Sequence, residues 1–228
     1  MMELYIANKN YSSWSMRPWL VLTAFELPFR EVLLPFPKER GTGHFKQDVL
    51  AINPNGKVPV LVHDGLMVWD SLAICEYLAE QFPERQLWPA GRAQRARARA
   101  LAAEMHSGFQ ALRNHCGMNI RADLAEVGQT LWAEQPDLRD DVARVCQIWS
   151  ERPDPGGFLC GDFSIADAFY APVVWRFKSY ALPVNEDSQY YMQTMLQHPA
   201  MQAWEQAVKQ EQDWVNYLEP YQSEPPSS

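Results

Sequence analysis

The sequence predicts an α/β domain followed by an all-α domain. Short apolar runs rich in β-branched residues, typical of strands, are confined to the first third of the 228-residue chain. Beyond that third the apolar residues recur at helical spacing, and few β-branched runs occur. A polar stretch with Pro and Gly, residues 83–91, separates the two patterns and is typical of a linker. We therefore expect domains at residues 1–82 and 92–222.

The first domain is expected to run strand–helix–strand and then strand–strand–helix. Its predicted elements are strands at residues 3–7, 29–34, 58–62 and 66–69, helices at 15–26 and 71–82, and a long polar loop at 35–49. Turn residues bound each strand. Pro18 is tolerated only in the first turn of a helix, so the first helix is expected to begin between Ser13 and Ser15.

Helical periodicity predicts the elements of the second domain. Helices are expected at residues 92–112, 123–132, 138–149 and 192–208. Ser164 and Asp167 stand three residues apart before an apolar run, which is the pattern of a capping box. The last residues, 223–228, are rich in Ser and Pro and are predicted to be disordered.

Composition narrows the classes of function. The net charge of −8 argues against nucleic-acid binding, which needs basic patches. No apolar run approaches the ~18–20 residues that span a membrane, and the start of the chain lacks the features of a signal peptide. The four cysteines are scattered without a metal or dithiol motif, so we expect no metal and a reducing, cytoplasmic location.

The stretch from Asn53 to Leu78 carries the most specific binding pattern. Pro59 at a strand start indicates an edge, a bulge or a special peptide bond. A cis bond after Val58 would turn the backbone N–H and C=O of Val58 outward, free to pair with an extended peptide. Asp70 and Ser71 begin a helix. There the Ser71 hydroxyl and the helix N–H groups can bind a carboxylate, and the Asp70 side chain can bind an ammonium group. From these residues alone, simple helix capping is the competing interpretation.

This stretch resembles the N-terminal domain of the cytosolic glutathione transferases. The matching pattern is Asn-Pro-x-x-x-Val-Pro-x-Leu, then Asp-Gly, then Asp-Ser-x-x-Ile-x-x-Tyr-Leu. The resemblance implies a thioredoxin-like first domain, an all-helical second domain and a homodimer. It also implies a cis Val58–Pro59 bond, with the Val58 backbone paired to glutathione and the γ-glutamyl end held by Asp70 and Ser71.

A second functional element is predicted at the start of the first helix. Unpaired N–H groups and partial positive charge at a helix N-terminus stabilise a thiolate, and a serine hydroxyl adds one hydrogen bond. Ser12 and Ser13 stand there, although both could simply cap the helix. The sequence Ser-Ser-Trp-Ser-Met-Arg is similar to the Ser-Ser-Cys-x-x-Arg motif of the zeta class, which includes maleylacetoacetate isomerase.

The resemblance leaves the identity of the catalytic serine open. The zeta motif implies Ser12, whereas the delta and theta classes imply Ser13. Trp14 replaces the cysteine of the zeta motif, which counts against the isomerase reaction. Arg17 is expected to form structural salt bridges.

The remaining site residues follow from the same resemblance. Trp14 is expected beside glutathione, and His44 and Lys57 near its glycine end, although His44 is equally typical of a solvated loop. Three residues of the first long helix and its exit are expected to line the electrophile pocket or, alternatively, to form an exposed polar face. They are Arg113, Asn114 and Met118.

The predicted function is that of a glutathione transferase, which activates the thiol of glutathione, its co-substrate, for attack on a small electrophile in detoxification. Two alternatives remain. One is a zeta-like isomerase, in which glutathione adds and leaves again. The other is a non-catalytic binding protein with the same fold.

Overall fold

The structure is a computed structural model that describes residues 1–222 of the chain. Its N-terminal part is a four-stranded sheet of order β2-β1-β3-β4, in which β1 and β2 are parallel and the other pairs antiparallel. The strands are β1 Met2–Ile6, β2 Phe29–Leu33, β3 Val60–His63 and β4 Leu66–Trp69. The helices of this part are α1 Ser13–Ala24, α2 Phe45–Ile52 and α3 Ser71–Gln81. Apart from α2, this is the α/β order that the sequence predicts.

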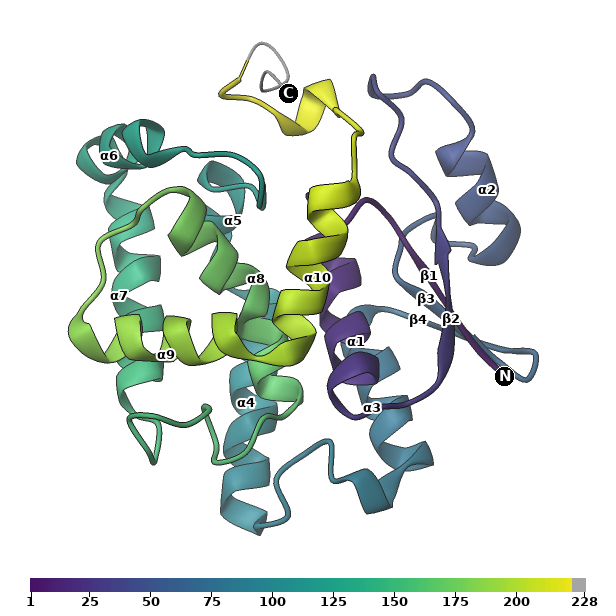
Figure 1. The fold of residues 1–228 in the computed structure, drawn as a ribbon, viewed down its shortest axis with the longest axis horizontal. Helices are drawn as coiled ribbons and strands as arrows, with labels where there is room; N and C mark the ends of the chain where they lie inside the picture. The colour runs from purple at the N-terminus through teal and green to yellow at the C-terminus, as the bar shows by residue number, and fades with distance from the viewer. Residues whose placement is uncertain (223–228) are drawn as a thin grey trace.

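Helices α1 and α3 lie between the sheet and the helical part of the molecule, whereas α2 lies on the other side of the sheet (Figure 1). The central strand β1 buries Leu4 and Ile6 completely. Helix α1 is buried along most of its length because it contacts α3, α8 and α10 as well as the sheet. The N-terminus of α1 is therefore enclosed by both halves of the chain.

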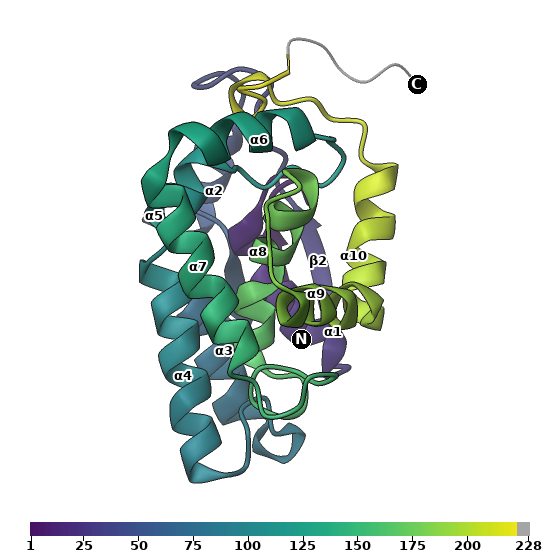
Figure 2. The same cartoon turned by 90° about the vertical axis from the view of Figure 1, so that its left-hand side faces the viewer.

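The C-terminal part contains only helices within the described residues. They are α4 Arg92–Ser107, α5 Gln110–His115, α6 Ala125–Glu134, α7 Pro136–Ser150, α8 Ile165–Ser179, α9 Glu186–Gln197 and α10 Pro199–Gln210, with short 3-10 turns at Pro83–Arg85 and Asn216–Leu218. Helix α8 buries 14 of its 15 residues. It packs against α1, α4 and α9, and Figure 2 shows it enclosed by the other helices. A helix that is apolar all round must be surrounded in this way.

The predicted capping box is confirmed at the start of α8. The backbone N–H of Ser164 donates to Asp167 at 3.0 Å, and the Ser164 hydroxyl donates to the same carboxylate oxygen at 3.1 Å. Both residues are buried, and neither lines the Ser71 or Ser13 cavity described below. Their role is consistent with stability.

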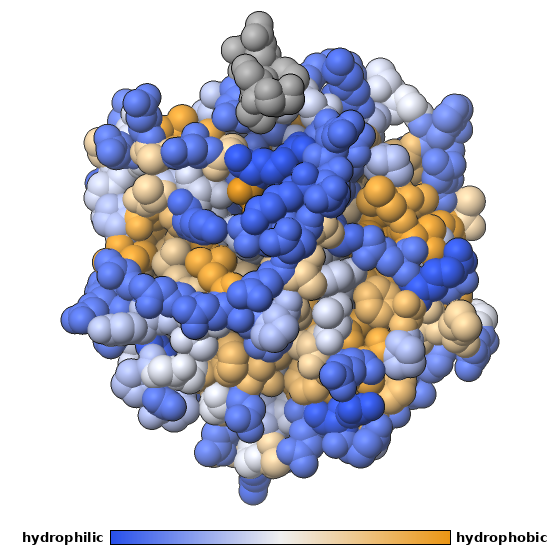
Figure 3. Space-filling model, in the orientation of Figure 1, coloured by the Kyte–Doolittle hydropathy of each residue, from blue (hydrophilic) through white to orange (hydrophobic). Residues whose placement is uncertain are grey.

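The segment after α10 crosses back to the N-terminal half. Helix α10 buries Met201, Trp204 and Val208 and turns a hydrophilic face outward, visible as part of a blue band in Figure 3. Beyond it, Glu219 accepts hydrogen bonds from Tyr11 Oη at 2.5 Å and from Asn119 Nδ2 at 2.6 Å. These contacts fix the C-terminal segment over the junction of the two halves.

Three sequence predictions of helix boundaries are wrong. The loop predicted at 35–49 contains the start of α2, which buries only Val49 and therefore shows no clear apolar stripe. The helix predicted at 92–112 is interrupted after Ser107, where Phe109 has a positive φ of 56°. The helix predicted at 192–208 is two helices, because Pro199 begins a new one. The tail predicted to be disordered, 223–228, lies outside the described residues.

Candidate active site

Two adjoining cavities lie where α1, α3 and the loop before β3 face α5. We call the first the Ser71 cavity. It has a volume of about 410 Å³ and is lined by Trp14, Asn55, Lys57, Val58, Pro59, Asp70, Ser71 and Arg113. The second, the Ser13 cavity, has a volume of about 390 Å³ and is lined by Tyr11, Ser12, Ser13, Trp14, Phe36, Phe45, Gly56, Lys57, Val58, Arg113, Gly117, Met118, Arg176 and Leu218. Four residues line both, so the cavities are two compartments of one cleft.

The Ser71 cavity carries groups suited to an amino acid. The Ser71 side chain is buried, yet its hydroxyl oxygen has no hydrogen-bond partner within residues 1–222. Asp70 has a φ of 74° and caps α3, accepting the N–H groups of Leu72 at 2.8 Å and Ala73 at 3.3 Å. A buried polar group normally has a partner. The free hydroxyl at this helix start is therefore suited to a bound carboxylate.

The loop before β3 contributes a backbone edge to the same cleft. The Val58–Pro59 peptide bond is cis, as the resemblance implied. Val58 lines both cavities, so a ligand that extended along it would pass from one compartment to the other. Asn53 stabilises this loop, because its side-chain amide donates a hydrogen bond to the carbonyl of Lys57 at 3.0 Å.

The helical half supplies a partner for Asp70. His106 Nε2 of α4 lies 3.3 Å from Asp70 Oδ2. Burial lowers the pKa of His106, and the nearby cations Arg17 and Arg113 lower it further, while Asp70 opposes them. His106 is therefore neutral at pH 7, and an N–H on Nε2 can donate to the carboxylate. Asp70 is thus oriented by both halves of the chain.

The Ser13 cavity contains both predicted catalytic serines, but their hydroxyls differ. The Ser12 hydroxyl donates to Ser15 Oγ at 2.7 Å. Ser13 Oγ instead accepts a hydrogen bond from Arg176 Nη2 at 3.3 Å, which leaves its own hydrogen free to donate. Both serines are at most 7% exposed and stand at the N-terminus of α1.

Arg176 reaches the site from α8. Its guanidinium also donates to the backbone carbonyl of Cys116, and the residue is 6% exposed. Burial lowers the pKa of Arg176 to about 10, which still leaves it protonated at neutral pH. A cation is therefore held beside Ser13 Oγ.

The prediction that Arg17 forms structural salt bridges is wrong within the described residues. Arg17 is 1% exposed, and its Nε and Nη1 atoms have no hydrogen-bond partner. Its guanidinium lies 4.1 Å from the ring centroid of Trp14 and 4.8 Å from that of Phe169. Burial first, and then repulsion from Arg113 and Arg176, lowers the pKa of Arg17 to about 9. The Arg17 guanidinium therefore packs against two aromatic rings, whereas the sequence analysis expected an acidic partner.

The structure brings together most of the residues that the sequence nominated. Those that line the cleft are Ser12, Ser13, Trp14, Lys57, Val58, Pro59, Asp70, Ser71, Arg113 and Met118. His44 and Asn114 do not line it. His44 is exposed at the start of α2, where Nδ1 contacts Gln47 at 3.1 Å. Asn114 is exposed on α5.

Several lining residues were missed by the sequence analysis. They include Tyr11, Phe36, Phe45, Arg176 and Leu218. Arg176 had a signal, since it is a charge at the end of the apolar run Ala168–Trp175. The other four had none, because only the fold brings the C-terminal segment and the loops after β1 and β2 to the same cleft.

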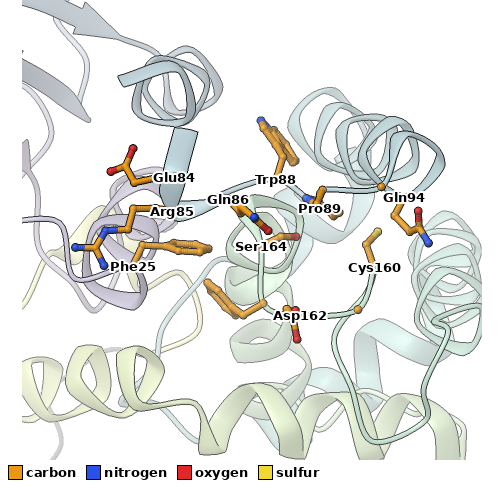
Figure 4. Close-up of a pocket in the computed structure, with 14 residues that line it drawn as sticks. Phe25, Glu84, Arg85, Gln86, Trp88, Pro89, Gln94, Cys160, Asp162 and Ser164 are labelled. Carbon is orange, nitrogen blue, oxygen red and sulfur yellow. The ribbon is translucent and has the colours of Figure 1, made fainter. Parts of the chain in front are cut away.

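A third cavity, of about 440 Å³, lies apart from this cleft, between the linker and the loop before α8 (Figure 4). None of the nominated site residues lines it. Its one cysteine, Cys160, is buried, and burial raises the pKa of that thiol to about 11. The thiol is therefore protonated at neutral pH and a poor nucleophile. The candidate catalytic serines lie instead in the Ser13 cavity.

Neither a metal site nor a membrane-spanning helix is found within residues 1–222. No three His, Cys, Asp or Glu side chains there are arranged to hold a metal ion. No helix of that range is both long enough and apolar enough to cross a membrane.

Comparison with known proteins gives a consistent result. Residues 11–81 match the family described as "Glutathione S-transferase, N-terminal domain", and residues 92–207 match "Glutathione S-transferase, C-terminal domain". The chain is 31% identical over 175 residues to glutathione S-transferase 1 of Dianthus caryophyllus, covering 76% of each protein. It is 30% identical over 174 residues to maleylacetoacetate isomerase of Rattus norvegicus, covering 75% of this chain and 76% of that protein.

Solved structures show the same fold. A glutathione transferase homolog from Burkholderia, solved with bound glutathione, superposes with a TM-score of 0.69 at 22% identity. The match covers 92% of this chain and 99% of that one.

Proposed function

Because this chain belongs to the glutathione S-transferase family, we propose that it is a glutathione transferase, an enzyme that activates the glutathione thiol for attack on a small electrophile. One observation carries this proposal. The buried, unpartnered hydroxyl of Ser71 lies in the same cleft as the helix N-terminus that bears Ser12 and Ser13. A ligand with an amino-acid group at one end and a thiol further along fits that arrangement.

In the proposed complex, glutathione extends along the Val58 backbone. Its γ-glutamyl carboxylate accepts from the Ser71 hydroxyl and from N–H groups at the start of α3, and its ammonium contacts Asp70. Lys57, which lines both cavities, is available for the glycine carboxylate. The Trp14 ring packs against the peptide. Such contacts at both ends hold the sulfur in place, which is the proximity contribution to catalysis.

We assign the hydrogen bond to sulfur to Ser13. The Ser13 hydroxyl is free to donate, and Arg176 polarises it by donating a hydrogen bond to its oxygen. The N–H groups at the N-terminus of α1 add partial positive charge. Together these groups favour the thiolate over the thiol, so more of the nucleophile is present at neutral pH. Ser12 is assigned a supporting role, because its hydroxyl donates to Ser15.

The isomerase remains the second candidate function. It is supported by the similarity to maleylacetoacetate isomerase of Rattus norvegicus. Trp14 stands where the zeta motif has cysteine, and this replacement favours the transferase. A product assay separates the two, because an isomerase releases glutathione unchanged whereas a transferase consumes it.

Further properties of the protein are proposed from its family. We propose that residues 1–82 form the glutathione-binding domain, 83–91 the linker and 92–222 the helical domain, and the two matched family regions, 11–81 and 92–207, support this division. We also propose a cytoplasmic homodimer that acts in detoxification. Size-exclusion chromatography with light scattering tests the dimer.

Two measurements test the function. Calorimetry with glutathione up to millimolar concentration is expected to show one site per chain. Turnover is then measured with 1-chloro-2,4-dinitrobenzene, where the thiolate forms a C–S bond to the ring and chloride leaves with the bonding electron pair. Heat of binding without any turnover across a panel of electrophiles, peroxides included, would favour a binding protein. No uptake of glutathione would overturn the proposal.

A further inference from the structure

The cleft has an excess of positive charge. Lys57, Arg113 and Arg176 line its two cavities, and Arg17 lies behind Trp14 at 4.1 Å from the ring centroid. Among the described lining residues, Asp70 is the one carboxylate. The net charge of the whole chain is −8, so this cluster is opposite in sign to the molecule that carries it.

Glutathione does not balance this charge completely. As a thiolate it carries two carboxylates, one thiolate and one ammonium, a net of two negative charges. The three lining cations and the single carboxylate of Asp70 balance these two negative charges, and Arg17, behind the Trp14 ring, adds a fourth cation. His106 is neutral, as argued above, and adds nothing. One positive charge is left over when glutathione is bound, and repulsion among buried cations disfavours leaving it unpaired.

Arg113 is the cation best placed to take a further anion. It is half-buried and lines both cavities. Its Nη1 atom donates to the carbonyls of His106 at 3.1 Å and Gly108 at 3.4 Å, and its guanidinium lies 4.6 Å from the Trp14 ring centroid. These contacts fix the guanidinium but use one of its nitrogens. A planar guanidinium held in this way is suited to a carboxylate.

The Ser13 cavity also has an apolar wall, which consists of Phe36, Phe45, Met118 and Leu218. Phe36 and Phe45 pack against each other with ring centroids 5.0 Å apart. A hydrocarbon or aromatic body fits this wall, while an anionic group fits Arg113.

Resting on the proposed function, we propose that the preferred electrophile is a carboxylate-bearing molecule with an apolar body, and that Arg113 is the residue that selects for the carboxylate. The carboxylate pairs with Arg113, the body contacts the apolar wall, and the reactive carbon faces the sulfur beside Ser13.

The test compares 4-(chloromethyl)benzoate with its methyl ester. In both, the thiolate attacks the benzylic carbon, a C–S bond forms and chloride leaves with the electron pair of the C–Cl bond. Each kcat/KM is divided by the rate of the uncatalysed reaction with glutathione, which cancels intrinsic reactivity. A charge-assisted hydrogen bond predicts a preference of about ten- to a hundredfold for the acid over the ester.

Three variants locate the source of the preference. Arg113→Met is expected to bring the ratio of acid to ester close to one while turnover of the ester is retained. Arg113→Lys is expected to keep part of the preference, since it keeps the charge. Arg85→Met is the matched control, because Arg85 is exposed and lines the remote third cavity. It is expected to leave the ratio unchanged.

Glutathione affinity, measured by calorimetry for every variant, separates the possible failures. Equal turnover of acid and ester by the wild type, or an unchanged ratio in Arg113→Met, would overturn this inference and leave the transferase function standing. A loss of glutathione affinity in Arg113→Met that accounts for the whole effect would assign Arg113 to glutathione and also overturn it. If the wild type takes up no glutathione, the proposed function itself fails.

Discussion

Arg176 Nη2 lies 3.3 Å from Ser13 Oγ, although 163 positions separate the two residues in the chain. The contact joins a buried cation of α8 to the hydroxyl at the start of α1. Because Arg176 donates to the Ser13 oxygen, the hydroxyl hydrogen of Ser13 is free to donate to another group, and both residues line the Ser13 cavity. The helical half of the protein therefore contributes a side chain to the proposed thiol site.

The first prediction separates the two serines. Ser13→Ala is expected to raise the pKa of bound glutathione by about one to two units, since a hydrogen bond to a charged group contributes about 1.5–3 kcal/mol and one pKa unit is about 1.4 kcal/mol. Ser12→Ala is expected to raise it by less, because that hydroxyl donates to Ser15. The ultraviolet absorbance of the thiolate, followed against pH, measures both. A larger shift in Ser12→Ala would reverse the assignment.

The second prediction concerns how Arg176 acts. If it polarises the Ser13 hydroxyl, Arg176→Gln raises the bound thiol pKa more in the wild type than in a Ser13→Ala background. Arg176→Lys is expected to restore part of the shift. Arg176 also donates to the carbonyl of Cys116, so its variants are expected to lose stability as well. The double-mutant cycle is therefore read from the thiol pKa of folded protein. Strict additivity would show that Arg176 acts independently of Ser13.

The third prediction compares two buried serines at helix starts. Ser71 Oγ has no partner in the described structure, so Ser71→Ala is expected to leave the melting temperature unchanged. The same change removes a donor to the glutathione carboxylate and is expected to raise the dissociation constant about ten- to a hundredfold. Ser164→Ala is the matched control, which is expected to lower stability by about 0.5–2 kcal/mol and to spare affinity. Thermal unfolding and calorimetry measure both effects. The site assignment fails if Ser71→Ala keeps full affinity.

The sequence predicted one part of the cleft better than the other, for a physical reason. Six of the eight residues that line the Ser71 cavity lie within one short stretch, residues 55–71, so local pattern was enough. The apolar wall of the Ser13 cavity is assembled from separate loops and the C-terminal segment. Leu218 reaches it only through contacts such as that of Glu219 with Tyr11, which no local pattern encodes.

Arg17 shows a different limit of sequence reasoning. Its position in the motif suggested a structural ion pair, but the side chain packs between Trp14 and Phe169 without an acid among the described residues. The motif predicts where the Arg17 side chain begins in the sequence. It does not predict which residues surround that side chain, because some of them, such as Phe169, come from the distant helix α8. The same limit explains why the sequence analysis did not place Arg176 near Arg17.

The last prediction concerns Asp167, which is fully buried at the start of α8. Its carboxylate accepts hydrogen bonds from the N–H of Leu159 at 2.9 Å and from Tyr191 Oη at 3.1 Å, in addition to both donors of Ser164. Burial nevertheless raises the pKa of Asp167 from 3.8 to about 6. Between these two values the folded protein binds more protons than the unfolded chain. The contribution of Asp167 to the free energy of unfolding therefore falls as the pH rises from 4 to 6.

Asp167→Asn tests this dependence. The variant is expected to be less stable than the wild type, because an amide group faces donors that need an acceptor. The difference in stability is expected to narrow between pH 4 and pH 7, by up to about 3 kcal/mol for a shift of about two pKa units. Asp140→Asn, at an exposed position of α7, is the matched control and should show no such trend. Urea unfolding at several pH values measures the difference. If the difference in stability between wild type and Asp167→Asn instead widens as the pH rises, the fold favours the ionised carboxylate. The four hydrogen bonds to Asp167 would then lower its pKa by more than burial raises it.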